Sequence, residues 1–135
     1  MIIYIDENLP HQLAESLNIL QQALNAKNRT SHEVKSLKLE FGTGAKDEEW
    51  IPEIPNSIVI TQDYNIQTTR HQRDLYEKHQ IGVFFIKSTK KGLSFWEMTK
   101  LLVDRWEEIL KIIRKDKTPF AYIGRVKSNF KKIED

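Results

Sequence analysis

The sequence predicts an α/β fold: a mostly parallel central sheet of about four or five strands with helices on both faces. Short runs dominated by apolar residues occur at residues 2–5, 57–61 and 82–86, as in strands that are buried on both faces. Stretches with apolar residues three and four positions apart, as in amphipathic helices, separate these runs. Because parallel neighbours need a crossover connection that a helix can supply, this alternation favours parallel pairing.

Two long helices are indicated along the chain. The first is expected from Pro10, which suits the first turn of a helix, and its apolar stripe is Leu13, Leu17, Leu20 and Leu24. The second is expected after Ser94, because Ser94 and Glu97 have the spacing of a capping box. Its apolar stripe comprises Phe95, Met98, Leu102, Trp106, Ile109 and Ile113. Both stripes predict helices that pack against the sheet.

The remaining segments carry weaker patterns. Residues 32–41 alternate imperfectly and are expected to form a second, shorter strand, and residues 119–126 are expected to form a last strand. A short helix is expected from Asp47, since acidic residues favour a helix start, and a surface helix is expected over residues 65–79. Residues 127–135 are expected to be a polar tail that frays.

The composition favours one folded domain over residues 1–135, because 39% of the residues are hydrophobic and 30% are charged. There is no cysteine, so a bound metal must use oxygen or imidazole ligands. The apolar start, residues 2–5, is too short for a signal peptide, and no apolar run approaches the roughly 20 residues that span a bilayer. We therefore expect a cytoplasmic protein without a membrane segment.

The charge is unevenly distributed, although the formal net charge is only +2. Residues 1–85 contain 8 Lys and Arg against 12 Asp and Glu, whereas residues 86–135 contain 13 against 7. An acidic first part followed by a basic second part is compatible with a polyanionic partner such as nucleic acid. Solvated helix faces account for the same pattern equally well.

Aspartates follow two of the predicted buried strands. Asp6 comes directly after residues 2–5, and Asp63 comes shortly after residues 57–61, at the strand ends where open parallel sheets bind ligands. Asp47, at the start of the expected short helix, is placed to complete an acidic cluster from the side. The alternative is that each aspartate only caps a helix or forms a turn, as single aspartates after strands often do.

Such a cluster predicts a divalent cation, Mg²⁺ or Mn²⁺, because carboxylates held together repel one another until a cation neutralises them. The cation activates a water for attack on a phosphodiester and offsets the charge that develops on the leaving oxygen. Further oxygen donors lie close in sequence to the three aspartates: Glu7, Glu48 and Asn65.

Basic residues near the acidic crevice are candidates for holding a substrate backbone. Arg70, Arg73 and Lys87 lie on a polar helix or at a strand end, where phosphates would pass, although ordinary solvation explains each equally well. His71, on the same helix, is a weaker candidate for catalysis. The tryptophans at positions 50, 96 and 106 are expected in the core rather than stacked on bases.

Three motifs occur in order: residues 3–10, the pattern Gly44-x-x-Asp47-x-x-Trp50, and the pattern Ile60-Thr61-x-Asp63-Tyr64-Asn65-Ile66. Together they resemble PIN-like domains, particularly the compact VapC-like toxins of type II toxin–antitoxin systems. The resemblance implies a three-layer PIN-like fold and endoribonuclease activity, with RNA as substrate and a cognate antitoxin as partner. It also implies that Asp6, Asp47 and Asp63 bind metal, with Thr61 and Asn65 in supporting positions. The oligomeric state, including a homodimer, is left open.

One position departs from the family pattern. Many PIN-like domains have a fourth acidic residue where this chain has Asn65. An asparagine can still ligate through its carbonyl oxygen, so a weaker second metal site is implied, and a plain helix cap at Asn65 is equally compatible with the sequence.

Two other functions fit acids after parallel strands. A phosphoacceptor receiver or phosphotransferase domain also places acids around Mg²⁺. However, haloacid-dehalogenase-like enzymes need Asp-x-Asp where this chain has Asp6-Glu7-Asn8, and Lys87 is only a loose match for a receiver lysine. A non-catalytic protein-interaction module would keep the fold and use the acids as caps.

Overall fold

The strands of the structure, a computed structural model, are β1 (Ile2–Ile5), β2 (Glu33–Ser36), β3 (Ile58–Asp63), β4 (Gly82–Lys87), β5 (Phe120–Arg125) and β6 (Ser128–Lys132). The helices are α1 (His11–Asn28), α2 (Leu37–Phe41), α3 (Asp47–Trp50), the 3-10 helix η1 (Ile51–Glu53), α4 (Ile66–Lys78) and α5 (Phe95–Lys115). The structure describes residues 1–6, 9–63, 66–88 and 92–133. For residues 63 and 66–71 it describes the backbone but not the side chains.

Within these residues the strands form one six-stranded sheet in the order β2-β1-β3-β4-β5-β6. Neighbouring strands run parallel from β2 to β5, and the edge strand β6 is antiparallel to β5. The predicted α/β class with a mostly parallel sheet is confirmed. The sheet has one strand more than the expected four or five, because the chain after residue 127 forms β6.

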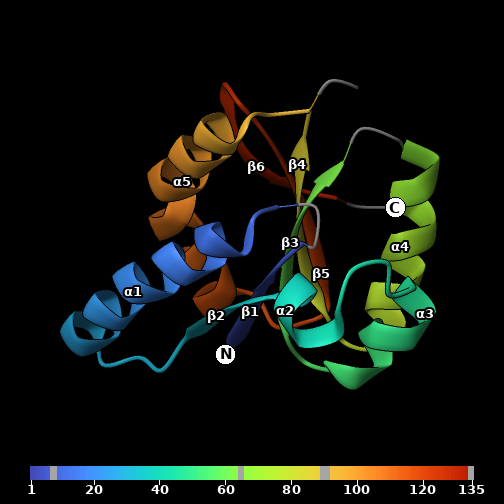
Figure 1. Cartoon of the computed structure of the whole chain (residues 1–135), viewed down its shortest axis with the longest axis horizontal. Coiled ribbons are helices and arrows are strands. Elements are labelled where there is room, and N and C mark those ends of the chain that lie inside the picture. The colour runs from blue at the N-terminus through green and yellow to red at the C-terminus, as the bar shows by residue number, and fades with distance from the viewer. Residues whose placement is uncertain (7–8, 64–65, 89–91, 134–135) are drawn as a thin grey trace.

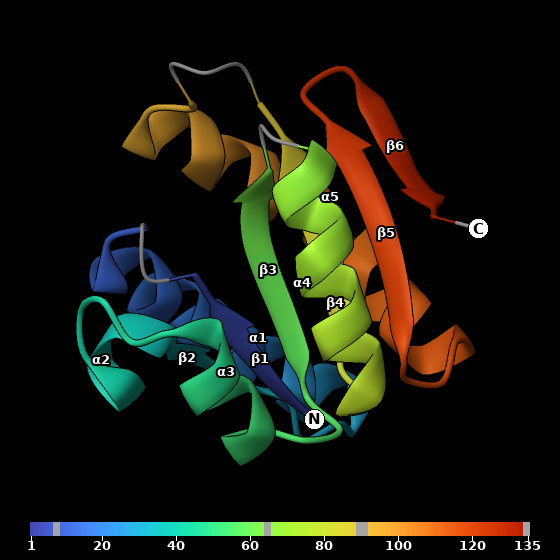
Figure 2. The same ribbon diagram turned by 90° about the vertical axis from the view of Figure 1, so that its right-hand side faces the viewer.

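Helices cover both faces of the sheet, which gives the molecule three layers (Figure 1). Alternate residues of a strand point to opposite faces, so Ile60 packs under α1 and α5 whereas Val59 packs under α2, α3 and α4. Figure 2 shows α3 and α4 in front of the sheet, with β5 and β6 extending to one side. No helix in the described ranges is long and apolar enough to cross a membrane.

The inward face of α1 differs from the predicted leucine stripe. Leu13 and Leu17 are buried as expected, but Leu20 is 50% exposed and Gln21 is fully buried in its place. Gln21 Oε1 accepts a hydrogen bond of 2.7 Å from the indole nitrogen of Trp106 on α5. The helix is therefore turned so that the polar pair of Gln21 and Trp106, rather than Leu20, joins it to α5.

The capping box at the start of α5 is present. Ser94 Oγ accepts from the backbone nitrogen of Glu97 at 3.2 Å, and the Glu97 carboxylate accepts from the backbone nitrogen of Ser94 at 2.9 Å. The predicted stripe is buried from Met98 to Ile113, whereas Phe95 is 39% exposed. Trp96 is 67% exposed, so the expectation that all three tryptophans lie in the core is wrong for this one.

Two segments were expected to have other structures. Residues 32–41 divide into β2 and α2, because Ser36 ends the strand and its hydroxyl accepts from the backbone nitrogen of Leu39, which caps the helix. The polar tail from residue 127 is not frayed throughout, since Phe130 in β6 is buried. The side chain of Glu108 on α5 accepts from the backbone nitrogen of Phe130 at 2.8 Å and fixes this strand.

Candidate active site

The candidate site lies at the point where the strand order of the sheet reverses, since the chain continues from β1 to β2 on one side and then to β3 on the other. β1 pairs in parallel with β2 on one side and with β3 on the other. In open parallel sheets, the carboxyl ends of two such strands border the crevice that binds ligands. Asp6 directly follows β1, and its backbone nitrogen donates to the carbonyl of Ile60 at 3.0 Å, whereas Asp63 is the last residue of β3.

The carboxylate of Asp6 is oriented by its neighbour on β3. Thr61 Oγ1 donates a hydrogen bond of 2.8 Å to Asp6 Oδ2, and Thr61 is only 6% exposed. A buried hydroxyl that donates to a carboxylate oxygen restricts the rotamer of that carboxylate. Thr61 therefore acts on Asp6 as a positioning residue.

Asp47 approaches Asp6 from the helical layer. It begins α3 after a loop in which Gly42 and Gly44 both have φ of +82°, a conformation that favours glycine. Gln72 Nε2 on α4 donates to Asp47 Oδ2 at 3.2 Å. Asp6 and Asp47 line one pocket of about 20 Å³, whose walls include Leu37, Phe41 and Trp50. This volume is the size of one water or one ion.

Both carboxylates also act on the hydroxyl of Tyr76, a fully buried residue of α4. Burial raises the pKa of Tyr76 well above its usual range, and the negative charges of Asp47 and Asp6 raise this pKa further. The same tyrosine is thus in the field of two aspartates that are 41 positions apart in the sequence. The site has negative potential, which a bound cation would offset.

Several predicted site residues cannot be compared with the pocket side chain by side chain. The side chains of Asp63 and Arg70, and all of Glu7 and Asn65, lie outside the described residues, as does the side chain of His71. The backbone of Asp63 is paired with Lys87 across β3 and β4. Glu48 is exposed on α3. Among the described side chains, no group of three acids and histidines is arranged to hold a metal ion.

The basic candidates separate in space. Lys87 ends β4 and is paired with Asp63, so it lies at the carboxyl edge of the sheet. Arg73 instead lines a cavity of about 210 Å³ between α4 and the start of β5, together with Pro119 and Ile133. The structure does not bring Arg73 to the pocket of Asp6 and Asp47.

Sequence reasoning missed two polar residues at this site. The sequence predicts only a surface helix over residues 65–79, yet the side chain of Gln72 in this helix is a hydrogen-bond partner of Asp47. Tyr76 lies in the same helix, and its side chain is buried in the core. No local pattern marks either residue, because both reach the site through the packing of α4 on the sheet.

A sequence model of the PIN like domain family matches residues 1–88 of this chain, which is more than half of its 135 residues. No curated protein and no solved structure matches the chain. PIN-like domains are generally nucleases, hydrolases that act on nucleic acids. The matched region contains β1 to β4 and both aspartates of the pocket, so the chain belongs to the PIN-like domain family.

Proposed function

We propose that this protein is a metal-dependent endoribonuclease of the cytoplasm and the toxin of a VapC-like toxin–antitoxin pair, neutralised by a cognate antitoxin. One observation carries the proposal: Asp6 and Asp47, from distant parts of a PIN-like chain, line one pocket at the carboxyl edge of the sheet. Hydrolysis of a phosphodiester needs charge neutralisation, and paired carboxylates provide it by holding a cation.

The residues of the pocket fit Mg²⁺ or Mn²⁺, because carboxylate oxygens are the ligands that these ions prefer and the pocket has room for one ion. In our proposal Asp6 and Asp47 hold the ion and Asp63 completes the set. Thr61 keeps Asp6 in place through its 2.8 Å hydrogen bond, and Gln72 does the same for Asp47. When bound, the cation supplies charge neutralisation and activates the attacking water.

The test is cleavage of a labelled single-stranded RNA by the purified protein in Mg²⁺, in Mn²⁺ and in EDTA. We expect internal cleavage with either ion and none in EDTA. The same ions should raise the melting temperature, since a ligand present at 100 times its Kd stabilises the folded state by about 2.7 kcal/mol. Unchanged melting at millimolar Mn²⁺, together with no cleavage, would contradict the proposal.

Thr61→Val is expected to lower RNA cleavage about 10-fold, because a residue that orients a metal ligand is commonly worth that much. The valine keeps the shape of the side chain but cannot donate to Asp6. The effect is measured as kcat at several Mn²⁺ concentrations, and we expect excess Mn²⁺ to restore part of the loss. Thr30→Val, which removes an exposed hydroxyl bonded to Asn25 on α1, is the control and should leave kcat unchanged.

The toxin role is tested separately from the chemistry. Expression of the chain in a bacterial host should stop growth, and co-expression of the neighbouring gene should restore it. A host that grows normally while the purified protein cleaves RNA would remove the toxin role and keep the nuclease.

A phosphoacceptor role is the second candidate. The backbone of Asp63 is paired with that of Lys87 in the sheet, and the order β2-β1-β3-β4-β5 is that of many doubly wound sheets. Acetyl phosphate that labels Asp63 in a protein without nuclease activity would favour this role over ours.

A further inference from the structure

A second concave surface lies beside the candidate site, between the start of α5 and the turn that joins β5 to β6. We call it the turn groove and define it by Lys87, Leu93, Glu97, Arg125, Val126 and Lys127. Its volume is about 820 Å³, and a neighbouring hollow of about 660 Å³ shares Leu93, Glu97 and Val126 with it. All but Lys87 lie beyond residue 88, where the family match ends.

The turn groove begins at the edge of the sheet that carries the site. Lys87 lines the groove and is the ladder partner of Asp63. Gln62, which lies between Thr61 and Asp63, accepts hydrogen bonds from Ser88 Oγ at 3.3 Å and from the backbone nitrogen of Leu93 at 3.4 Å. One strand end thus joins the groove to the residues that surround Asp6.

The far wall of the turn groove is held rigidly. Arg105, a buried residue of α5, donates to the carbonyl oxygens of Arg125, Val126 and Ser128 in the turn. Its guanidinium carbon lies 6.0 Å from the centre of the Phe130 ring. A turn with several charge-assisted hydrogen bonds is a preformed wall, so a ligand need not order it.

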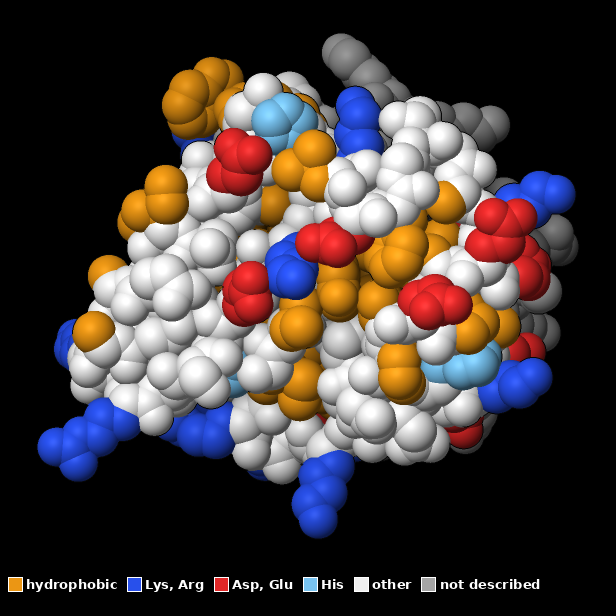
Figure 3. Space-filling model, turned by 60° about the horizontal axis from the view of Figure 1, so that its bottom comes forward, with side chains coloured by type: hydrophobic (Ala, Val, Ile, Leu, Met, Phe, Trp, Pro, Cys, Tyr) orange, Lys and Arg blue, Asp and Glu red, His pale blue; other side chains and the backbone are white. Residues whose placement is uncertain are grey.

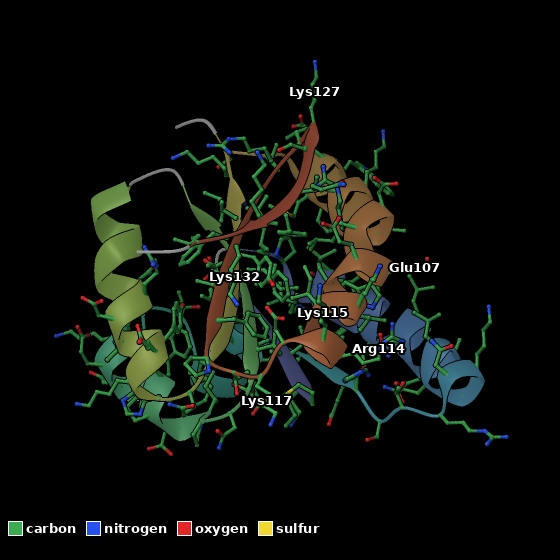
Figure 4. The ribbon with its side chains drawn as sticks, turned by 180° about the vertical axis from the view of Figure 1, so that it is seen from behind. Glu107, Arg114, Lys115, Lys117, Lys127 and Lys132 are labelled. Carbon is green, nitrogen blue, oxygen red and sulfur yellow. The ribbon has the colours of Figure 1, made fainter. Side chains whose placement is uncertain are left out.

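Most of the charged side chains that line the turn groove are basic. Lys87, Arg125 and Lys127 line it, and the one acidic side chain among its lining residues, Glu97, belongs to the capping box of α5. Figure 4 shows Lys127 at one end of β5 and Lys117 near the other. The face in Figure 3 mixes acidic, basic and hydrophobic side chains.

An exposed aromatic pair lies at the start of α5, next in the chain to residues that line the turn groove. Trp96 is 67% exposed and Phe95 is 39% exposed, and their ring centres are 5.7 Å apart in an edge-to-face arrangement. They lie between Ser94 and Glu97, two residues of the groove lining. The other tryptophans, Trp50 and Trp106, are buried. Exposed aromatic rings beside a basic groove are what proteins use to stack the bases of a single strand while cations hold its phosphates.

We propose that the turn groove and the Phe95–Trp96 pair bind a single-stranded stretch of nucleic acid and lead it to the pocket of Asp6 and Asp47. The proposal rests on the proposed nuclease function for the use of the site, although binding is measured without cleavage. A duplex is excluded as the preferred ligand, because its paired bases are stacked on one another and cannot stack on Trp96.

The first test uses the full chain with Asp6→Asn, which prevents cleavage, and a fluorescein-labelled single-stranded oligouridine as the probe. Adding Trp96→Ala should raise the Kd about 5- to 100-fold, the range known for loss of one stacked base. Ile19→Ala, which removes a 72% exposed side chain from α1, should leave the Kd unchanged. A duplex of the same length should bind more weakly than the single strand.

The second test measures the salt dependence of the Kd. Each phosphate contact with a single strand contributes about 0.7 to the slope of log K against log salt. The double variant Arg125→Ala with Lys127→Ala loses two such contacts and should therefore make this negative slope shallower by about 1.4. The matched control, Lys115→Ala with Lys117→Ala, removes two exposed cations near the opposite end of β5 and should leave the slope unchanged.

The outcomes separate the two proposals. If Trp96→Ala and the turn variant bind like the parent while the wild type cleaves RNA, the turn groove is not the binding surface and the nuclease function stands. If the wild type binds through the turn groove but never cleaves, the proposed nuclease function is wrong, whereas the turn groove remains the binding surface. Equal or tighter binding of the duplex, or no binding of the single strand at 50 mM salt, would contradict the proposal that the turn groove binds a single strand.

Discussion

Asp6→Asn is expected to lower RNA cleavage at least about 100-fold, because loss of a metal ligand removes several kcal/mol of transition-state stabilisation. The amide keeps the hydrogen bond from Thr61 but carries no charge. Without metal, the free energy of unfolding should rise, since Asp6 and Asp47 no longer repel each other across their shared pocket. Cleavage is measured at saturating Mn²⁺, and unfolding is measured in EDTA with urea.

The matched control for this change is Asp74→Asn, which neutralises an exposed carboxylate on α4. It should leave both cleavage and unfolding within error of the wild type. Full cleavage by the Asp6 variant, after contaminating nuclease has been removed, would show that the pocket is not the active site. A fall in stability without metal would show that the two carboxylates do not repel each other appreciably.

Arg105→Met is expected to lower the free energy of unfolding by about 2–4 kcal/mol, because three backbone carbonyls of the β5–β6 turn lose a charged donor. Methionine retains much of the apolar stem that packs beside Phe130, so the loss reports mainly on the hydrogen bonds. Urea unfolding followed by circular dichroism measures it.

Arg114→Met is the natural comparison, since Arg114 is exposed near the end of the same helix and its loss should change stability by no more than about 0.5 kcal/mol. If the two variants unfold alike, the turn does not depend on Arg105. In that case Arg105 does not hold the wall of the turn groove rigid either.

Most of the fold follows from local patterns in the sequence. The apolar runs became β1, β3 and β4, because a strand covered on both faces must be apolar along its whole length. The start of α5 could be placed because Ser94 and Glu97 form a capping box from four consecutive residues. Such signals need no knowledge of the rest of the chain.

The misjudged segments depend on distant partners. Residues 127–135 read as a polar tail, but Phe130 finds a place in the core beside Phe84, 46 positions earlier in the chain. Gln21 lies outside the predicted leucine stripe of α1, yet it is buried and accepts a hydrogen bond from the indole nitrogen of Trp106. Neither partner is visible from the local sequence.

The candidate site was predictable in the same limited sense. Asp6 and Asp47 could be named because one follows an apolar run and the other begins a helix after a glycine loop, and these positions meet at the edge of the sheet. Whether Asp63 joins them stays a prediction. Trp96 lies outside the predicted apolar stripe of α5 and is exposed, so its expected place in the core followed from its residue type and not from the helical period.

The aromatic contacts of Phe84 show how the core of residues 1–88 depends on the rest of the chain. Phe84 is fully buried, and its ring centre lies 5.5 Å from that of Phe120 and 5.2 Å from that of Phe130. Both partners come from the chain beyond residue 88, as does α5, which covers the same side of the sheet. The family region and the rest of the chain therefore share one hydrophobic core, and residues 1–88 on their own would expose an apolar face of the sheet to water.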